Sequence, residues 1–137
     1  MKRLLTVIIA LISASLVFSQ SPVDISELQI KDKIYLYNGS PFTGSCYEKH
    51  GNGKIGLKGQ FKAGMKDGVW TWWYSTGQKK RETTYLDNKK EGITYYWHPN
   101  GQKAKELMFR NDKNIDQKLW DENGNRLPNP AFSQTTD

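Results

Sequence analysis

The sequence is poor in the residues that most often form cross-links or reactive sites. Cys46 is the only cysteine, so no disulfide can form within the chain and packing must supply its stability. Cys46 takes the place of Trp70 in the repeat described below, which predicts a small buried residue; a free thiol that links two chains is the alternative. A Gly-x-Ser-x-Gly elbow, a phosphate-binding loop and a Cys/His pair are also missing. The sequence therefore predicts no catalytic residues and no enzyme.

Histidine is scarce as well, since the chain contains only His50 and His98. The two lie two repeats apart, which in a continuous sheet separates them by about 19 Å. Zinc ligands lie about 2 Å from the metal, so this pair cannot share one ion. The sequence predicts no metal site and no cofactor, and we expect His98, which precedes Pro99, to end a strand.

Long apolar runs are absent except at the start of the chain. Lys2 and Arg3 precede an uncharged run from Leu4 to Phe18, and small residues lead to a cut after Ser19. This run is shorter than the roughly 18 apolar residues that a membrane helix needs, so it predicts a cleaved secretory signal peptide over residues 1–19. We expect the mature protein to be exported, either to the periplasm or to the medium.

Acidic residues are outnumbered, with 14 Asp and Glu against 20 Lys and Arg and a formal net charge of +6. The surplus is spread through the expected turns, where lysine commonly keeps the edges of sheets solvated and apart. Weak attraction to anionic lipid or polysaccharide is the alternative. Export argues against nucleic acid as a partner, although the chain is basic.

What the chain does have is a regular repeat, in which the residue number of each equivalent position rises by 24. Aromatic residues, glycines before strands, glycines in turns and glutamates all recur at this step. The columns are Tyr37, Phe61, Tyr85 and Phe109; Gly44, Gly68 and Gly92, with Asp116 next; Gly53, Gly77 and Gly101, with Gly124 one position early; and Glu82 with Glu106. A fixed period of this length is typical of repeat arrays, in which each unit packs on its neighbour.

Each unit contains two strand-like segments separated by a turn with glycine. Residues 68–74 and 79–85, like 92–98 and 103–109, are rich in aromatic and β-branched side chains. This predicts an all-β fold: an elongated antiparallel meander of hairpin repeats in a single twisted sheet, over residues 31–127. Equivalent residues of successive repeats would then lie about 9.6 Å apart.

The ends of the chain are expected to be simpler. Residues 31–37 resemble the second half of an incomplete first unit, and the last unit, residues 116–127, is one residue short. Degenerate end units are expected in repeat arrays because they cap the sheet. We expect residues 20–30 to be a linker and residues 128–137 a flexible tail.

Aromatic residues of the two best-preserved units are the candidate binding residues: Trp70, Trp72, Trp73, Tyr95, Tyr96 and Trp97. They either form the core, because aliphatic residues are few, or receive sugar rings, an extended peptide or a partner's apolar surface. Both roles are compatible, since alternation directs Trp72 and Trp73 to opposite faces. For Glu82 and Glu106 we expect charge pairs with lysines of neighbouring strands; two carboxylates flanking a sugar bond are the alternative.

The pattern Gly-x-Trp-x-x-Trp-Tyr-x-x-Gly-Gln…Glu-x-x-Tyr over residues 68–85, with its copy at 92–109, resembles MORN repeats. It is most similar to the bacterial variant found in proteins often labelled antitoxin-like. The resemblance spans residues 33–127 and implies an elongated sheet of hairpins with a role in protein or membrane contact. The pattern is broken where Cys46 and Thr94 replace Trp70, and a contact surface built from that column would be interrupted.

The sequence therefore predicts an exported, non-enzymatic module that acts by protein–protein contact with a partner of unknown identity. An antitoxin-like protein that neutralises a toxin is one alternative, and a module that binds glycans or lipid surfaces is another. Open edge strands also predict that two chains pair end to end as a homodimer.

Overall fold

The computed structural model describes residues 21–129, so the predicted signal peptide and residues 130–137 of the predicted tail lie outside the described part. The described residues form strands and one short 3₁₀ helix. In chain order these are β1 (Val23–Asp24), η1 (Ile25–Glu27), β2 (Gln29–Lys31), β3 (Ile34–Tyr37), β4 (Ser40–Pro41), β5 (Gly44–Lys49), β6 (Ile55–Lys62), β7 (Met65–Lys66), β8 (Gly68–Trp73), β9 (Lys79–Leu86), β10 (Lys89–Trp97), β11 (Lys103–Arg110), β12 (Lys113–Trp120) and β13 (Arg126–Leu127).

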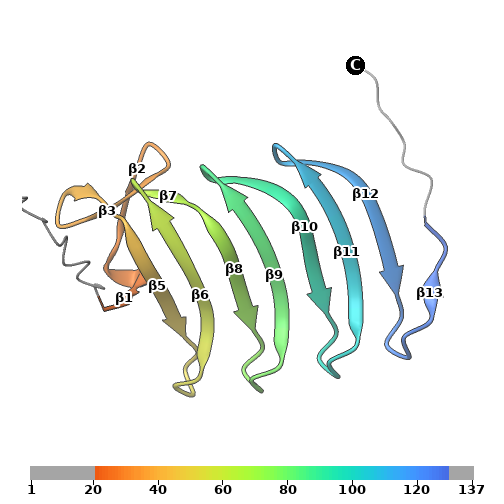
Figure 1. Cartoon of the computed structure of the whole chain (residues 1–137). Coiled ribbons are helices and arrows are strands. Elements are labelled where there is room, and N and C mark those ends of the chain that lie inside the picture. The colour runs from red at the N-terminus through yellow and green to blue at the C-terminus, as the bar shows by residue number, and fades with distance from the viewer. Residues whose placement is uncertain (1–20, 130–137) are drawn as a thin grey trace, which may run out of the picture.

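The predicted meander is confirmed as one large open sheet (Figure 1). Its strands follow the order β1-β5-β6-β8-β9-β10-β11-β12-β13, with β7 beside β6. Neighbouring strands from β5 onward are antiparallel, whereas β1 pairs in parallel with β5 and covers part of that edge. At the other end, β13 pairs with only two residues of β12.

The N-terminal segment differs from the expectation. Residues 20–30 were expected to be a linker, but β1, η1 and most of β2 lie within them. Strands β2, β3 and β4 make a separate three-stranded sheet instead of an incomplete repeat. This small sheet packs on one face of the large sheet, where the Tyr35 ring lies 4.4 Å from the Phe61 ring. The first repeat has no preceding repeat to cover its apolar residues, and the small sheet takes that role.

The register of the large sheet confirms the repeat. Gly44 pairs with Phe61, Gly68 with Tyr85, and Gly92 with Phe109, so each leading glycine lies opposite the repeat aromatic. Gly68 and Gly92 have φ angles of 75° and 78°, and a Cβ added to either would meet no atom within 4 Å. Glycine is therefore needed for the backbone conformation of the bend, and not because a larger side chain would clash.

Two kinds of turn join the strands. The turns at one end contain Gly77 and Gly101 at positive φ, as their sequence predicts. At the other end the turns between β9 and β10 and between β11 and β12 have two residues at positive φ without glycine, for example Asp87 (49°) and Asn88 (69°), whereas the turn between β6 and β7 contains Gly64. The Asn88 side chain accepts a 2.7 Å hydrogen bond from the backbone N–H of Lys66, and so joins neighbouring hairpins.

The last unit is shortened within its bend. Up to Asn114 the register of β11 and β12 matches that of β9 and β10 in the preceding unit. Beyond it, Leu107 pairs with Gln117, whereas the equivalent Thr83 pairs with Thr94. One position has therefore been lost just after Asn114, in the part of the bend where the earlier units have their leading glycine.

Candidate functional site

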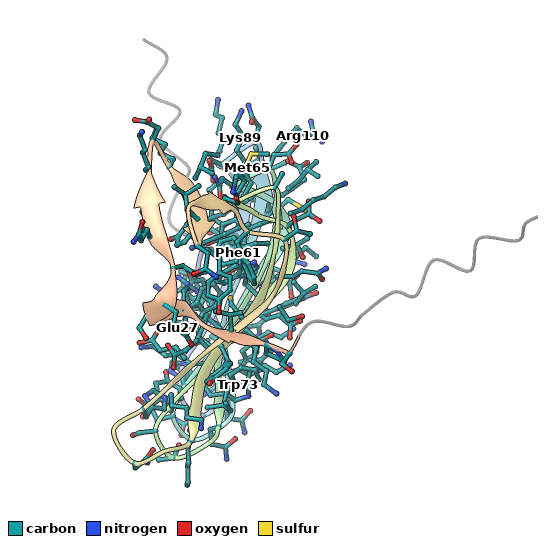
Figure 2. The ribbon with its side chains drawn as sticks, turned by 90° about the vertical axis from the view of Figure 1, so that its left-hand side faces the viewer. Glu27, Phe61, Met65, Trp73, Lys89 and Arg110 are labelled. Carbon is teal, nitrogen blue, oxygen red and sulfur yellow. The ribbon has the colours of Figure 1, made fainter. Side chains whose placement is uncertain are left out.

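The two faces of the large sheet differ in what covers them. Phe61, Trp70 and Tyr85 lie on the face where the small sheet packs, here called the covered face, and Phe61 is seen between the two sheets (Figure 2). The opposite side is called the open face. Among the described residues, the buried cluster is built on the covered face.

Trp70 does not belong to a binding surface, contrary to its place among the candidate residues. It is 0 % exposed, its ring packs edge-on against Phe61 at 4.9 Å, and its Nε1–H donates to the carbonyl oxygen of Gln60 at 3.1 Å. Cys46 and Thr94, which replace Trp70 in the neighbouring units, are also buried, at 2 % and 1 % exposure. The column is therefore interior, and its variation changes packing without interrupting a surface.

Trp72 and Tyr96 also lie on the covered face, on either side of Arg81 in the register. Both are half-buried. Trp72 packs against the buried cluster, and the Arg81 guanidinium stacks 3.5 Å from the centre of its ring. Trp72 therefore supports the core and Arg81 covers its ring, whereas Tyr96 lies on the same face outside the buried cluster.

The other three candidates, Trp73, Tyr95 and Trp97, lie on the open face. Trp73 pairs with Lys79 and Trp97 pairs with Lys103. Trp120, which was not among the candidate residues, pairs with Arg126 in the equivalent place. Trp120 follows Trp97 by 23 residues, and Gly124 follows the turn glycine Gly101 by the same shortened step. This shared step is the sequence signal that makes Trp120 the equivalent of Trp97.

These residues form one row across the open face, the Trp–cation stripe, in which tryptophan and a cation alternate. Its members are Trp73, Lys79, Trp97, Lys103, Trp120 and Arg126. Lys79 Nζ lies 5.1 Å from the centre of the Trp97 ring, and Lys103 Nζ lies 5.3 Å from that of Trp120. Each lysine thus bridges two successive repeats.

A row of polar residues runs beside the stripe. Lys79 pairs with Glu82 at 2.8 Å, and Glu106 pairs with Lys103 at 3.1 Å and with Lys118 at 2.9 Å. The Lys118–Glu106 pair is the predicted kind, between neighbouring strands, whereas the other two are formed within a strand. Tyr95 pairs with both glutamates in the register and so separates them. Both carboxylates are thus held by lysines.

Side chains of the preceding repeat fix the tryptophan positions. His50 Nε2 lies 3.0 Å from the carbonyl oxygen of Trp73, and His98 Nε2 lies 3.0 Å from that of Trp120. Tyr74, which is equivalent to the two histidines, donates to the carbonyl oxygen of Trp97 at 2.8 Å. The histidine bonds require a proton on Nε2, so each histidine serves as a donor between repeats. Within residues 21–129 no group of three or more side chains could hold a metal ion.

A groove of about 640 Å³ opens on the same face at the N-terminal end of the stripe. Trp73 is one of its walls and also the first member of the stripe, so the two are continuous. Tyr47, Lys58 and Val69 line it further along. Val69 is 54 % exposed, which leaves apolar surface accessible at this end.

Cys46 is buried as the sequence predicts, and its thiol is free. Burial raises the pKa of this thiol to about 11, so it stays protonated at neutral pH. A protonated, buried thiol is a poor nucleophile, which argues against cross-linking of chains through this residue.

Glu106 provides a test of the polar row. Hydrogen bonds from Lys118 and Lys103 lower the pKa of its carboxyl below 4.5. Because the folded pKa lies below the unfolded value, the stabilisation is present above pH 4.5 and is lost as the pH falls through the folded pKa. We expect Glu106→Gln to lower the free energy of unfolding at pH 7 by at most about 1 kcal/mol.

Urea denaturation of the wild type and of Glu106→Gln at a series of pH values measures this effect. The difference between the two should shrink as the pH falls below 4.5. Glu122→Gln is the control, since Glu122 takes part in none of the ion pairs of the described residues. A difference that does not change with pH would contradict the assignment.

The described part of the chain is thus a repeat protein: an open sheet of β-hairpin units with a stripe of equivalent residues on one face. Residues 66–87 and 90–111, each one strand–turn–strand unit, match the family described as the MORN repeat variant. These two units are therefore MORN repeats of the variant type. A comparison with curated proteins gave no match. No helix within residues 21–129 is long and apolar enough to cross a membrane.

Proposed function

We propose that this chain is a non-enzymatic binding module whose contact surface is the open face around the Trp–cation stripe. The observation that supports this most is that three tryptophans recur on the face opposite the buried cluster. Trp73, Trp97 and Trp120 are half-buried and lie outside the buried cluster, so part of each side chain is accessible to a partner. Aromatic residues and arginine are enriched at interaction surfaces relative to the rest of a protein surface.

The family and the geometry support the same class of function. MORN repeats form modules that often serve in binding, and catalytic groups are not brought together on the open face, where Glu82 and Glu106 are each held by lysine. Contact with a protein partner, including an antitoxin-like role toward a toxin, is one form of this proposal. Export, and thus a partner in the periplasm or medium, is part of it as well.

The open sheet edge offers a second surface, for contact between two copies. Among the described residues, β13 covers only Leu119 and Trp120, and no other strand of residues 21–129 pairs with the outer edge of β12 from Lys113 to Lys118. An exposed edge of this kind can pair with another strand. We keep the end-to-end homodimer as a proposal that size measurement in solution would test.

Hydroxyl-radical footprinting tests the binding face for any protein partner. The protein is oxidised alone and in the presence of extracts of the cell envelope and medium of its source organism. We expect Trp97 and Trp120 to be protected by the extract, because a partner on the open face would cover them. Trp72 and Tyr96, on the covered face, are the internal controls and should oxidise equally in both samples.

Protection confined to Trp72 and Tyr96 would place the contact on the covered face and contradict the proposal. Equal oxidation of all these residues with and without extract would also contradict it. A matched pair of variants, Trp97→Ala and Tyr96→Ala, adds a second measurement. Only Trp97→Ala should abolish the protection of Trp120 from oxidation by the extract.

A further inference from the structure

The Trp–cation stripe is periodic as well as partly exposed. Its three tryptophans occupy equivalent places in successive repeats, and two strands at about 4.8 Å each separate them by about 9.6 Å. Side-chain hydrogen bonds from His50, Tyr74 and His98 to the tryptophan carbonyl oxygens hold each of these places in the same way. A ligand that uses the whole stripe must therefore offer the same group at a regular step.

An extended polysaccharide has this property, whereas the surface of a folded protein presents different side chains along any line. One face of a pyranose ring is made of C–H groups and can stack on an indole ring. The interval of about 9.6 Å is close to the length of two sugar units in an extended β-linked chain. Each tryptophan would then stack on one sugar ring of one disaccharide.

The charges around the stripe favour an anionic chain. The stripe and the row beside it contain five cations and two carboxylates: Lys58, Lys79, Lys103, Lys118 and Arg126 against Glu82 and Glu106. The side chains of Lys79 and Lys103 remain 43 % and 40 % exposed although each pairs with a glutamate. The cations alternate with the rings, so they recur at the interval at which a charged disaccharide repeats its acidic group.

We propose that the Trp–cation stripe binds an extended anionic polysaccharide with one acidic group per disaccharide, and that the chain end enters the groove beside Trp73. This inference rests on the proposed function, since it names the ligand of the same face. The rings bind alternate sugars, and Lys79, Lys103 and Arg126 bind the acidic groups between them. Three tryptophans correspond to three disaccharides.

Calorimetric titration with hyaluronan oligosaccharides of two to ten sugars tests this inference, since hyaluronan has one carboxylate per disaccharide. We expect the affinity to rise with length up to the hexasaccharide and then to level off, because three disaccharides span the stripe. Trp97→Ala should lower the affinity for the hexasaccharide by about tenfold. Tyr96→Ala, on the covered face, should leave the affinity unchanged, and circular dichroism would verify that both variants are folded.

Cellohexaose, a neutral chain of the same length, is the control for charge and should bind at least about tenfold more weakly. Equal affinity for cellohexaose, or no dependence on length, would overturn the inference. If no oligosaccharide binds while a protein in the extract protects Trp97 and Trp120, the ligand is a protein and the binding face stands. If neither the oligosaccharides nor the extract affect these tryptophans, the inference and the proposed function both fail.

Discussion

Replacing Trp70 with alanine should lower the free energy of unfolding by about 3–5 kcal/mol, the cost of removing a large buried ring. The ring is 0 % exposed and packs edge-on against Phe61 at 4.9 Å and Tyr85 at 6.1 Å. Lys66 Nζ lies 4.7 Å from the centre of the ring, and the indole N–H donates to Gln60. All of these contacts join β8 to its neighbours, so their loss weakens the link between the first two full repeats.

Urea denaturation followed by circular dichroism measures this effect. Trp73→Ala is the matched control, because Trp73 lies on the same strand but on the open face, and we expect it to cost about 1 kcal/mol or less. Domains of this size are typically stable by about 5–15 kcal/mol, so Trp70→Phe serves as a milder variant if Trp70→Ala does not fold. If the alanine variants of Trp70 and Trp73 lowered the free energy of unfolding equally, the assignment of the two faces would be contradicted.

The sequence predicted the sheet because its period is carried by residues with different physical roles. Gly68 and Gly92 adopt positive φ in the bend, Gly77 closes a turn, and Tyr85 fills the core opposite Gly68. These requirements act locally, and their agreement at one step leaves few folds other than a meander. The repeat and its strands could therefore be predicted from the sequence, whereas the pairing of individual residues and the bulges came from the structure.

The sequence did not determine which face is the core. Alternation assigns Trp70 and Trp73 to opposite faces, but it is symmetric and does not indicate which of the two is covered. The cover comes from β2–β4, whose short strands fall outside the repeat and were expected to be a linker and a partial unit. Because this contact is between distant segments, no local pattern indicated it, and the candidate residues were divided between the two faces.

The Trp70 column shows how repeats that differ in size still share one backbone. Across the sheet, Trp70 pairs with Thr83, and Gly59 lies on its other side, opposite Cys46. In the next unit Thr94 replaces the tryptophan and pairs with Leu107. A large residue is thus accompanied by a glycine and a small residue by a leucine, as close packing requires.

Gly59→Ala should therefore destabilise the protein by about 1–3 kcal/mol through overpacking. A Cβ on Gly59 would lie 2.3 to 2.6 Å from three atoms of the Trp70 ring, which Phe61 and Tyr85 keep from moving away. Gly51→Ala is the matched control, since a Cβ there meets nothing within 4 Å, and it should change the stability by less than about 0.5 kcal/mol.

A double-mutant cycle separates this steric effect from any intrinsic cost of alanine at position 59. In the Trp70→Leu background the ring atoms that clash are gone, so the added methyl group occupies space that the smaller side chain leaves. We expect Gly59→Ala to be neutral or stabilising there, with a coupling energy of about 1–3 kcal/mol. If Gly59→Ala costs the same in both backgrounds, the glycine is required by the strand itself and the packing of Trp70 does not depend on it.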